Sequence, residues 1–278
     1  MQDLNSFIVN ALSEDIGSGD FTTISTIPKE NTGEAICLVK EDCILAGVEM
    51  AKKICEIADP SLKFKFLFED GAIIKAPQNI GSIKGSVHSI LKIERLFLNC
   101  MQRMSAIATK TNHLVQLLAP YQTRILDTRK TTPNFRIAEK WAVKIGGGLN
   151  HRFGLYDQIL IKDNHIQAAG GIQEAIDACA NYLNTHQMRI PVIVEVKNTE
   201  EFLIANSSDI VDRILVDNFT PNAIKVLINQ NSCNKPIEAS GGITEQNILE
   251  YAQSGVNYVS LGDLTHHVQS IDISLKIV

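Results

Sequence analysis

The sequence predicts an α/β fold in which a parallel α/β barrel follows an N-terminal α+β sandwich. From Arg124 onward, short apolar runs alternate with helical patterns. Strands that alternate with helices form parallel sheets, either doubly wound or closed into a barrel. The dinucleotide-binding pattern Gly-x-Gly-x-x-Gly does not follow the first run, which favours the barrel. Earlier in the chain, helices and strands are mixed without this alternation, which indicates a separate domain.

The N-terminal domain is predicted over residues 1–110. In residues 62–68, Leu62, Phe64, Phe66 and Phe68 recur at every second position, as in a half-buried strand. Residues 17–20 are expected to form a turn or, alternatively, a mobile segment near the site. The expected strands cover residues 33–39, 62–68, 72–75 and 82–88, and the expected helices cover 4–11, 51–58 and 89–119. The last of these helices is expected to lead into the barrel.

The barrel domain is predicted over residues 111–267, and residues 268–278 are a candidate to pack back on the N-terminal domain. Thr132 is expected to cap the first helix, Pro133 to occupy its first turn and Gly146-Gly147-Gly148 to end it. The expected strands are residues 124–128, 158–162, 191–196, 213–216, 236–239 and 258–261. The later helices are expected over 172–183, 199–206, 221–228 and 244–253.

Composition excludes several classes of partner. A net charge of −5 removes the electrostatic case for nucleic acid or an anionic membrane as the main partner. No apolar stretch approaches the roughly 20 residues that span a membrane, and no signal-peptide pattern opens the chain. We therefore expect a cytoplasmic protein. Its cysteines form no close Cys-x-x-Cys pair and are expected to be reduced core residues: Cys37, Cys43, Cys55, Cys100, Cys179 and Cys233.

Charged residues stand where the predicted barrel strands end, which is where barrel enzymes carry their chemistry. Side chains alternate along a strand, so those at the strand ends can share the inward face. Lys162 could pair there with Glu195 or Asp217 as a structural ion pair, because a buried charge without a partner is costly. The cations outnumber these carboxylates, however, so the site requires an external anion. The cationic group is Arg129, Lys130, Arg152 and Lys162, with His151 beside them.

Glycines close the last two strands, in Ser240-Gly241-Gly242 and in Ser260-Leu261-Gly262. Barrels commonly bind a phosphate at these positions through backbone N–H groups, and glycine lets the backbone approach an oxyanion closely. Either sequence alone would also suit a tight turn, but together they indicate phosphate binding. The pair His266-His267 could suggest a metal, but without a nearby acidic or thiol partner in the sequence we do not expect one.

The same residues resemble the quinolinate phosphoribosyltransferase family, also called nicotinate-nucleotide pyrophosphorylase (carboxylating). The resemblance covers nearly the whole chain. Its most specific segments are EDIGSGDFTT (14–23), ERLFLN (94–99), LDTRKTTPNFR (126–136), GGGLNHRFGLYDQILIKDNHI (146–166), VEV (194–196), VDNF (216–219), EASGGI (238–243) and SLGDLTHH (260–267). The probability that so many segments match in the same order by chance is very small.

The resemblance implies an open N-terminal sandwich, an incomplete barrel and a homodimer in which one subunit's sandwich covers the partner's barrel; a larger assembly of dimers stays open. It implies a reaction of quinolinate with phosphoribosyl pyrophosphate that needs Mg²⁺ and no organic cofactor, and yields nicotinate mononucleotide, pyrophosphate and CO₂. Residues implied to bind substrate are Arg95 (across the dimer interface), Thr128, Arg129, Lys130, His151, Arg152, Lys162, Glu195 and Asp217.

Further roles follow from the same resemblance. The implied catalytic residues are Lys130, Lys162, Glu195 and Asp217; Glu195 and Asp217 are also implied to hold the metal, directly or through water. The implied phosphate loops are Ser240, Gly241 and Gly242, and Ser260, Leu261 and Gly262. Two residues depart from the family pattern. Ala106 stands where glycine is usual, and Asp263 stands where a small residue is usual.

Two rival functions stay open from the sequence. A Schiff-base lyase would use a lysine at an inward strand end, which Lys162 satisfies. A non-catalytic or altered-substrate paralogue, such as a molybdenum-uptake-associated relative, would bind an oxyanion without this reaction. The presence of Glu195 and Asp217 speaks against the second rival.

Overall fold

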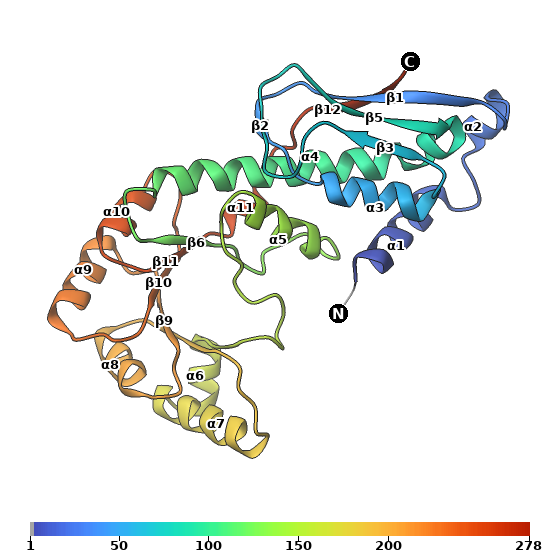
Figure 1. Cartoon of the computed structure of the whole chain (residues 1–278). Helices are drawn as coiled ribbons and strands as arrows, with labels where there is room; N and C mark the ends of the chain where they lie inside the picture. Colours follow the sequence, from blue (N-terminus) through green and yellow to red (C-terminus); the bar gives the residue numbers. More distant parts are fainter. Residues whose placement is uncertain (1–2) are drawn as a thin grey trace. The chain divides into compact units, whose positions relative to one another are not determined.

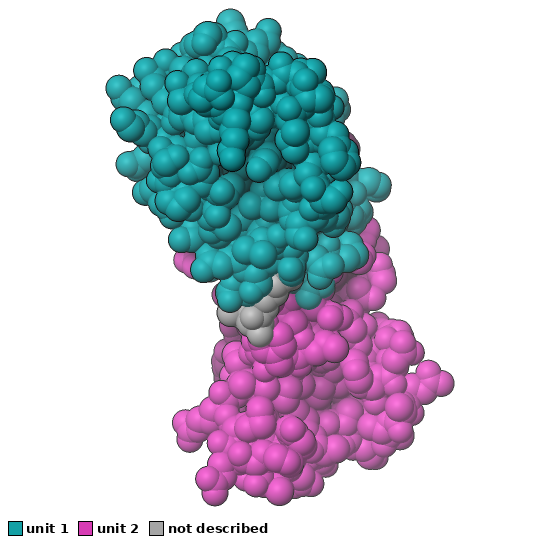
Figure 2. All heavy atoms as spheres, turned by 90° about the vertical axis from the view of Figure 1, so that its right-hand side faces the viewer, with its two compact units in different colours: residues 1–113, 131–147, 264–278 teal, residues 114–130, 148–263 magenta. Residues whose placement is uncertain are grey.

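The computed structural model describes residues 3–278, and the chain divides into two compact units (Figure 2). The first unit comprises the chain up to residue 113 together with residues 131–147 and 264–278. The second unit comprises residues 114–130 and 148–263. Helix α4 (Val87–Leu117) contains the boundary that the sequence predicted near residue 110.

The first unit is built on a four-stranded antiparallel sheet in the order β12-β1-β5-β3. Its strands are β1 (Thr32–Val39), β3 (Lys63–Phe66), β5 (Gln78–Ser86) and β12 (Ile273–Ile277). The alternation in β3 is as expected, because Phe64 and Phe66 lie half-buried on one face and stack with ring centroids 4.3 Å apart. A separate pair joins β2 (Cys43–Ile44) to β4 (Ile73–Ile74).

Helices of the first unit begin at polar caps in two places. Asp3 caps α1 (Leu4–Ile16), and its carboxylate accepts the Ser6 N–H. Asp20 caps α2 (Phe21–Thr26), a helix that the sequence analysis missed. The expected turn at residues 17–20 is therefore the connection between these helices. The remaining long helices are α3 (Val48–Ala58), α4, and α5 (Arg136–Ile145).

The predicted start of α5 was wrong. The helix begins at Arg136, after Phe135, and Thr132 does not cap it. Thr132 instead donates its N–H to Glu139 Oε2 at 3.0 Å and its hydroxyl to Glu139 Oε1 at 2.9 Å. Glu139 is fully buried and also accepts a hydrogen bond from Arg103 Nε. A buried carboxylate needs several donors, so Thr132 serves that carboxylate rather than the helix end. Gly146 does end the helix, as predicted.

The second unit holds a six-stranded parallel sheet in the order β6-β11-β10-β9-β8-β7. The first strand of this unit, β6, thus pairs with its last, β11, as in a barrel. Between β6 and β7, a parallel bridge joins Leu126 to Leu149. The strands are β6 (Arg124–Leu126), β7 (Ile159–Ile161), β8 (Val192–Val196), β9 (Arg213–Asp217), β10 (Ile237–Ser240) and β11 (Tyr258–Ser260). The predicted α/β class, with an incomplete parallel barrel after an N-terminal sandwich, is confirmed.

Helices surround the strands of this unit (Figure 1). They are α6 (Asp163–Ala169), α7 (Ile172–Thr185), α8 (Thr199–Ser207), α9 (Pro221–Gln230) and α10 (Ile248–Gln253). The short α11 (Asp263–His266) follows β11, and all of it after Asp263 belongs to the first unit. Helix α8 packs against β8 and β9, and α10 packs against β11. The sequence analysis missed α6. It also started α10 too early, because Asn247 Oδ1 accepts the Thr244 N–H and forms a turn before the helix.

The inward face of the barrel begins with an apolar layer. Leu160, Ile193 and Leu215, from three neighbouring strands, are buried together. Two residues further along each strand, the next inward positions are Lys162, Glu195 and Asp217. The strand alternation therefore places the charged residues directly above the apolar layer, as the period of the sequence predicted.

The cysteines only partly match their prediction. All six are free, and Cys37, Cys43, Cys55 and Cys100 are buried. Burial raises the pKa of Cys37, Cys55 and Cys100 to about 12, so these thiols are unreactive at neutral pH. The other two, Cys179 and Cys233, are only half-buried. Within residues 3–278, every helix is too short or too polar to cross a bilayer.

Candidate active site

The carboxyl ends of β7, β8 and β9 bring three predicted site residues together. Lys162 Nζ lies 2.8 Å from Glu195 Oε2, and the Glu195 side chain is only 5% exposed whereas that of Lys162 is 45% exposed. Burial raises the pKa of Asp217, the Glu195 charge raises it further, and Lys162 opposes both effects. These three groups therefore share one electrostatic environment at neighbouring strand ends.

A cleft opens beside this group. It is lined by Glu195 together with residues from α6 and from the segment that follows β8: Asp163, Ile166, Gln167, Lys197 and Glu201. Lys197 Nζ pairs with Asp163 Oδ2 at 3.3 Å. Sequence reasoning did not select Asp163, Lys197 or Glu201. The signal was present, because Asp163 directly follows Lys162 and Lys197 directly follows the strand that carries Glu195.

A buried carboxylate anchors the His151 segment. Asp127, which is fully buried, follows β6 and accepts the His151 backbone N–H at 2.8 Å and the Asn150 side-chain amide at 2.5 Å. Sequence reasoning missed Asp127, although it precedes Thr128 and Arg129 at the end of the first barrel strand. It ties the predicted residues of the first strand end to those at positions 151 and 152.

Arg152 is a buried cation close to a second cation. Its residue is 7% exposed. Burial lowers the pKa of Arg152, and the positive charge of Arg129 lowers it further, while Asp157 acts in the opposite direction. Two guanidinium groups that repel each other, one of them desolvated, form a site that an anion would stabilise. Arg129 and Lys130 are exposed on the adjoining loop, where the Lys130 N–H donates to the Thr128 hydroxyl.

The first glycine loop has the backbone geometry that its sequence suggested. Gly241 and Gly242 have φ of 94° and 62°, in the left-handed region that favours glycine. A Cβ at Gly241 would clash with the side chain of Asn218, so the loop closes tightly against the residue after β9. The Asn218 N–H donates to the Ser240 carbonyl at 2.8 Å. The next helix, α10, begins only at Ile248, so backbone amides rather than an adjacent helix end are what this loop offers.

The second glycine loop follows β11. Ser260 and Leu261 are buried and Gly262 is half-buried. The Leu261 N–H donates to the Leu126 carbonyl at 3.0 Å, which holds this loop against the end of β6. Helix α11 starts immediately afterwards, at Asp263. Asp263, the predicted departure from the family pattern, thus lies directly beside this loop.

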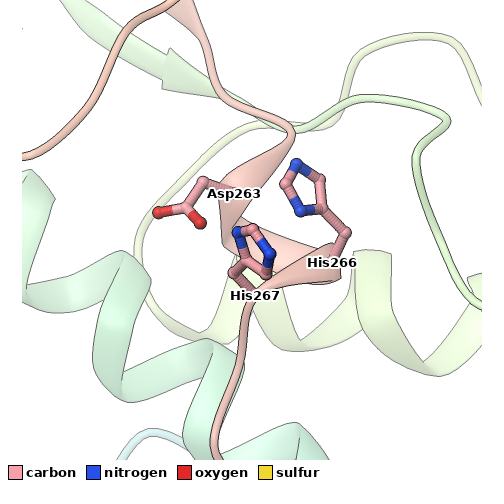
Figure 3. A group of neighbouring side chains, drawn as sticks. All are labelled: Asp263, His266 and His267. Atoms are coloured by element: carbon pink, nitrogen blue, oxygen red, sulfur yellow. The ribbon is translucent and has the colours of Figure 1, made fainter.

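Asp263 also lies close to the two histidines that follow it (Figure 3). One potential ligand atom from each of Asp263, His266 and His267 lies within 4.8 Å of the others. The sequence argument overlooked this carboxylate, although it precedes His266 by three residues and thus lies on the same helical face. The statement that the histidine pair lacks an acidic neighbour was therefore wrong.

Two further predicted features lie in the first unit. Arg95 is an exposed residue of α4, and its contribution to a partner's site stays a prediction. Ala106, the other departure from the family pattern, is 5% exposed within the same helix. A methyl group is accommodated at this buried position.

The second unit is thus a parallel α/β barrel with charged side chains and glycine loops at the carboxyl ends of its strands, the arrangement of barrel enzymes. Models of the N-terminal and C-terminal domains of quinolinate phosphoribosyl transferase match residues 20–105 and 107–276. The chain therefore belongs to the quinolinate phosphoribosyltransferase family, as its motifs predicted.

Individual relatives agree with this assignment. The chain is 41% identical to the chloroplastic nicotinate-nucleotide pyrophosphorylase (carboxylating) of Arabidopsis thaliana, over 99% of this chain and 83% of the relative. It is 40% identical to the probable nicotinate-nucleotide pyrophosphorylase (carboxylating) of Bacillus subtilis, over 99% and 92%. The solved nicotinate-nucleotide pyrophosphorylase of Francisella tularensis superposes with a TM-score of 0.90 at 37% identity, over 99% and 96%.

Proposed function

We propose that this protein transfers the phosphoribosyl group of phosphoribosyl pyrophosphate to quinolinate, with Mg²⁺ present, and releases pyrophosphate and CO₂. The product is nicotinate mononucleotide, a precursor in NAD biosynthesis. The observation that carries this proposal is the burial of Arg152, which is 7% exposed; burial and the charge of Arg129 both lower the pKa of its guanidinium. Both substrates are polyanions, and their charge would stabilise this desolvated guanidinium.

Quinolinate carries adjacent ring carboxylates, which arginine can bind through two parallel hydrogen bonds. We assign Arg129, Lys130, Arg152 and Lys162, with Thr128 and His151, to the substrate anions. We assign a phosphate to backbone N–H groups of the loops at 240–242 and 260–262. Gly242 has a left-handed φ and open space where a side chain would stand, whereas the Leu261 N–H is already bonded to the Leu126 carbonyl. Lys162 would act at the centre, since its ammonium lies half-exposed above the apolar layer.

The proposed chemistry uses the charges of the strand ends. The bond from the ribose anomeric carbon to pyrophosphate breaks, and the bonding electrons leave with the pyrophosphate oxygen. The ribose becomes oxocarbenium-like, and Glu195 and Asp217 would stabilise or orient it. The ring nitrogen then bonds to the anomeric carbon and becomes a pyridinium. When the C2 carboxyl leaves as CO₂, its electrons stay on C2, which takes a proton from solvent. The pyridinium stabilises this carbanion, so an organic cofactor is not needed.

Glu195 and Asp217 fit the predicted metal. Burial first, and then the negative charge of Glu195, raises the pKa of Asp217, and two carboxylates at neighbouring strand ends are the kind of oxygen donors that Mg²⁺ accepts, directly or through water. When bound, Mg²⁺ would neutralise the phosphate oxygens of the leaving group. Asp217→Asn should weaken Mg²⁺ binding, measured by calorimetry, and should also lower activity.

The Schiff-base alternative loses support from the structure. A lysine that attacks a carbonyl must be neutral, and apolar burial is what favours the neutral form. Lys162 instead pairs with Glu195 at 2.8 Å and is half-exposed, so it lacks the apolar burial that such a lysine requires. Borohydride trapping with a carbonyl substrate should therefore fail. The non-catalytic alternative would bind the same anions without releasing pyrophosphate.

The deciding experiment mixes the purified protein with quinolinate, phosphoribosyl pyrophosphate and Mg²⁺ and measures nicotinate mononucleotide, pyrophosphate and CO₂. Nicotinic acid replaces quinolinate in a parallel reaction, which tests whether the second carboxyl is required. Formation of product from quinolinate but not from nicotinic acid supports the proposal. Absence of pyrophosphate release, with both substrates shown to bind, would instead identify a non-catalytic paralogue.

We further propose a homodimer in which Arg95 enters the partner's site. Mixing denatured Arg95→Ala and Lys162→Ala chains and refolding them together tests this sharing. A mixed dimer has one site that holds both wild-type residues if Arg95 acts across the interface. Activity should then recover to about a quarter of the wild-type value, because half of the dimers are mixed and each has one intact site. If Arg95 acts within its own subunit, the mixture stays inactive.

A further inference from the structure

A buried carboxylate inside the barrel has no role in the proposed reaction. Glu238 lies in the middle of β10, and its residue is fully buried. It is opposite Leu215 of β9 and Tyr258 of β11 in the strand register. It therefore points to the same interior face as the apolar layer. A carboxylate at such a place is costly unless other groups hold it.

One oxygen of Glu238 is satisfied by an arginine. Arg213 Nη1 lies 2.9 Å from Glu238 Oε2, and the guanidinium lies over the Tyr258 ring, 4.6 Å from its centroid. Burial raises the pKa of Glu238, while Arg213, the Ser260 hydroxyl and Lys162 favour its ionised form. The Arg213 contact explains how the carboxylate is retained, but it uses only Oε2.

The other oxygen faces a histidine. Glu238 Oε1 has no hydrogen-bond partner among residues 3–278, and it lies 3.6 Å from His151 Nε2. That separation is an electrostatic contact and is longer than a hydrogen bond. His151 is itself buried, so little water screens the contact. A negative oxygen at this place favours a proton on Nε2.

The opposite nitrogen of the same ring has a different partner. The Arg152 backbone N–H donates to His151 Nδ1 at 2.7 Å. This bond requires an unprotonated Nδ1, because a protonated nitrogen has no lone pair to accept with. The Nε2–H tautomer is therefore the one that satisfies both sides of the neutral ring. It presents its proton to Glu238 and its lone pair to Arg152.

We propose that Glu238 is a positioning residue that selects the Nε2–H tautomer of His151 and thereby fixes the backbone that carries the Arg152 guanidinium. Asp127 holds the His151 N–H and so secures the same segment from the other side. The chain of contacts runs from Arg213 through Glu238 and His151 to Arg152, and it lies entirely within the second unit. This inference deepens the proposed function and rests on it only where activity is measured.

Glu238→Gln is the informative variant, because a glutamine keeps the shape and can present an N–H to His151. The proton should then move to Nδ1, where it opposes the Arg152 N–H. Nitrogen-15 NMR of labelled histidine reports which ring nitrogen carries the proton. The chain has seven histidines, and a His151→Ala spectrum identifies the signal of His151. The ligand-free wild type should show the Nε2–H form, and Glu238→Gln should lose it.

Glu139→Gln is a matched control. Glu139 is equally buried and ion-paired to an arginine, Arg103, but it lies in the first unit. Glu139→Gln should lower the melting temperature about as much as Glu238→Gln does, and it should leave the His151 signal unchanged. If both variants leave that signal unchanged, or if the wild type already carries the proton on Nδ1, the positioning role of Glu238 is wrong. This readout needs no substrate, so it is independent of whether the proposed reaction occurs.

Kinetics supply the second test. If the wild type is active, Glu238→Gln should lower kcat/KM by at least about tenfold, the size expected when a buried hydrogen-bond network loses its alignment. The same replacement made in a His151→Ala background should have little further effect, because Glu238 acts through His151. Equal losses in both backgrounds would show a purely structural role. An inactive wild type with the expected NMR shift would refute the proposed reaction alone.

Discussion

Lys162 Nζ and Glu195 Oε2 lie 2.8 Å apart, so the cation at the end of β7 is held by the carboxylate at the end of the neighbouring strand β8. The pair is asymmetric, because Glu195 is buried and Lys162 is half-exposed. An ion pair of this kind keeps the ammonium in place and still leaves it accessible to an anion. The structural ion pair and the binding role that the sequence left as alternatives are therefore compatible.

Lys162→Ala should abolish most turnover, because it removes the ammonium that faces the substrates. The fold should persist, since water can reach the half-exposed position and solvate Glu195. Steady-state rates with quinolinate, together with far-ultraviolet circular dichroism, measure both effects. Lys225→Ala, which removes an exposed lysine of α9, should leave both rate and spectrum unchanged. Near-normal activity of the Lys162 variant would refute its assignment.

Arg129→Ala should also remove most activity, since Arg129 lies in the loop after β6 and its charge acts on Arg152. Loss of substrate anion binding should raise KM for at least one substrate by about tenfold or more, because one charge-assisted hydrogen bond contributes about 1.5–3 kcal/mol. Arg189→Ala removes an exposed arginine of the same unit and serves as the control. Equal KM values for the two variants would contradict the assignment.

Asp127→Ala should reduce stability and activity together. It leaves the His151 N–H and the Asn150 amide without their buried acceptor, and each unsatisfied donor costs about 1–3 kcal/mol. Because His151 and Arg152 then lose their anchor, kcat/KM should fall further than the stability change alone explains. Urea unfolding gives the first quantity, and kinetics at a temperature where the variant is fully folded give the second. Retained kcat/KM in the folded variant would exclude an anchoring role.

Asp263→Ala should strengthen binding of phosphoribosyl pyrophosphate. The replacement removes a negative charge beside the loop at 260–262. We expect KM for this substrate to fall about two- to fivefold at low salt, and the difference to shrink as salt screens the charge. KM for quinolinate is measured alongside. An unchanged KM for phosphoribosyl pyrophosphate would show that Asp263 lies outside the reach of the bound phosphates.

Asp59 should make the stability of the protein depend on acid pH. The Ser61 hydroxyl first, then the Ser89 hydroxyl and the Ser61 N–H, lower the pKa of Asp59 below 3.8. A carboxyl with a lowered folded-state pKa stabilises the fold above pH 3.8, and this contribution is lost as the pH falls through the folded-state pKa. The unfolding free energy of Asp59→Asn should therefore differ from wild type at pH 7 and converge with it in acid. A difference that stays constant over this range would contradict the titration.

The sequence by itself determined the alternation of strands and helices, and hence the barrel. Strand β8 and strand β9 were placed almost to the residue, because their period of two is a local property. The same period placed Lys162, Glu195 and Asp217 on one face. The family assignment also came from local segments, since each motif is contiguous.

Only the tertiary structure decided which distant groups meet. The start of α5 was misplaced because Thr132 bonds to the buried Glu139 instead of to the helix. Asp127 and Glu238 were overlooked because their roles depend on partners more than 20 residues away in the chain. Burial and the choice of partner depend on the folding of the whole chain, so the local pattern could name the charged residues but not their pairing.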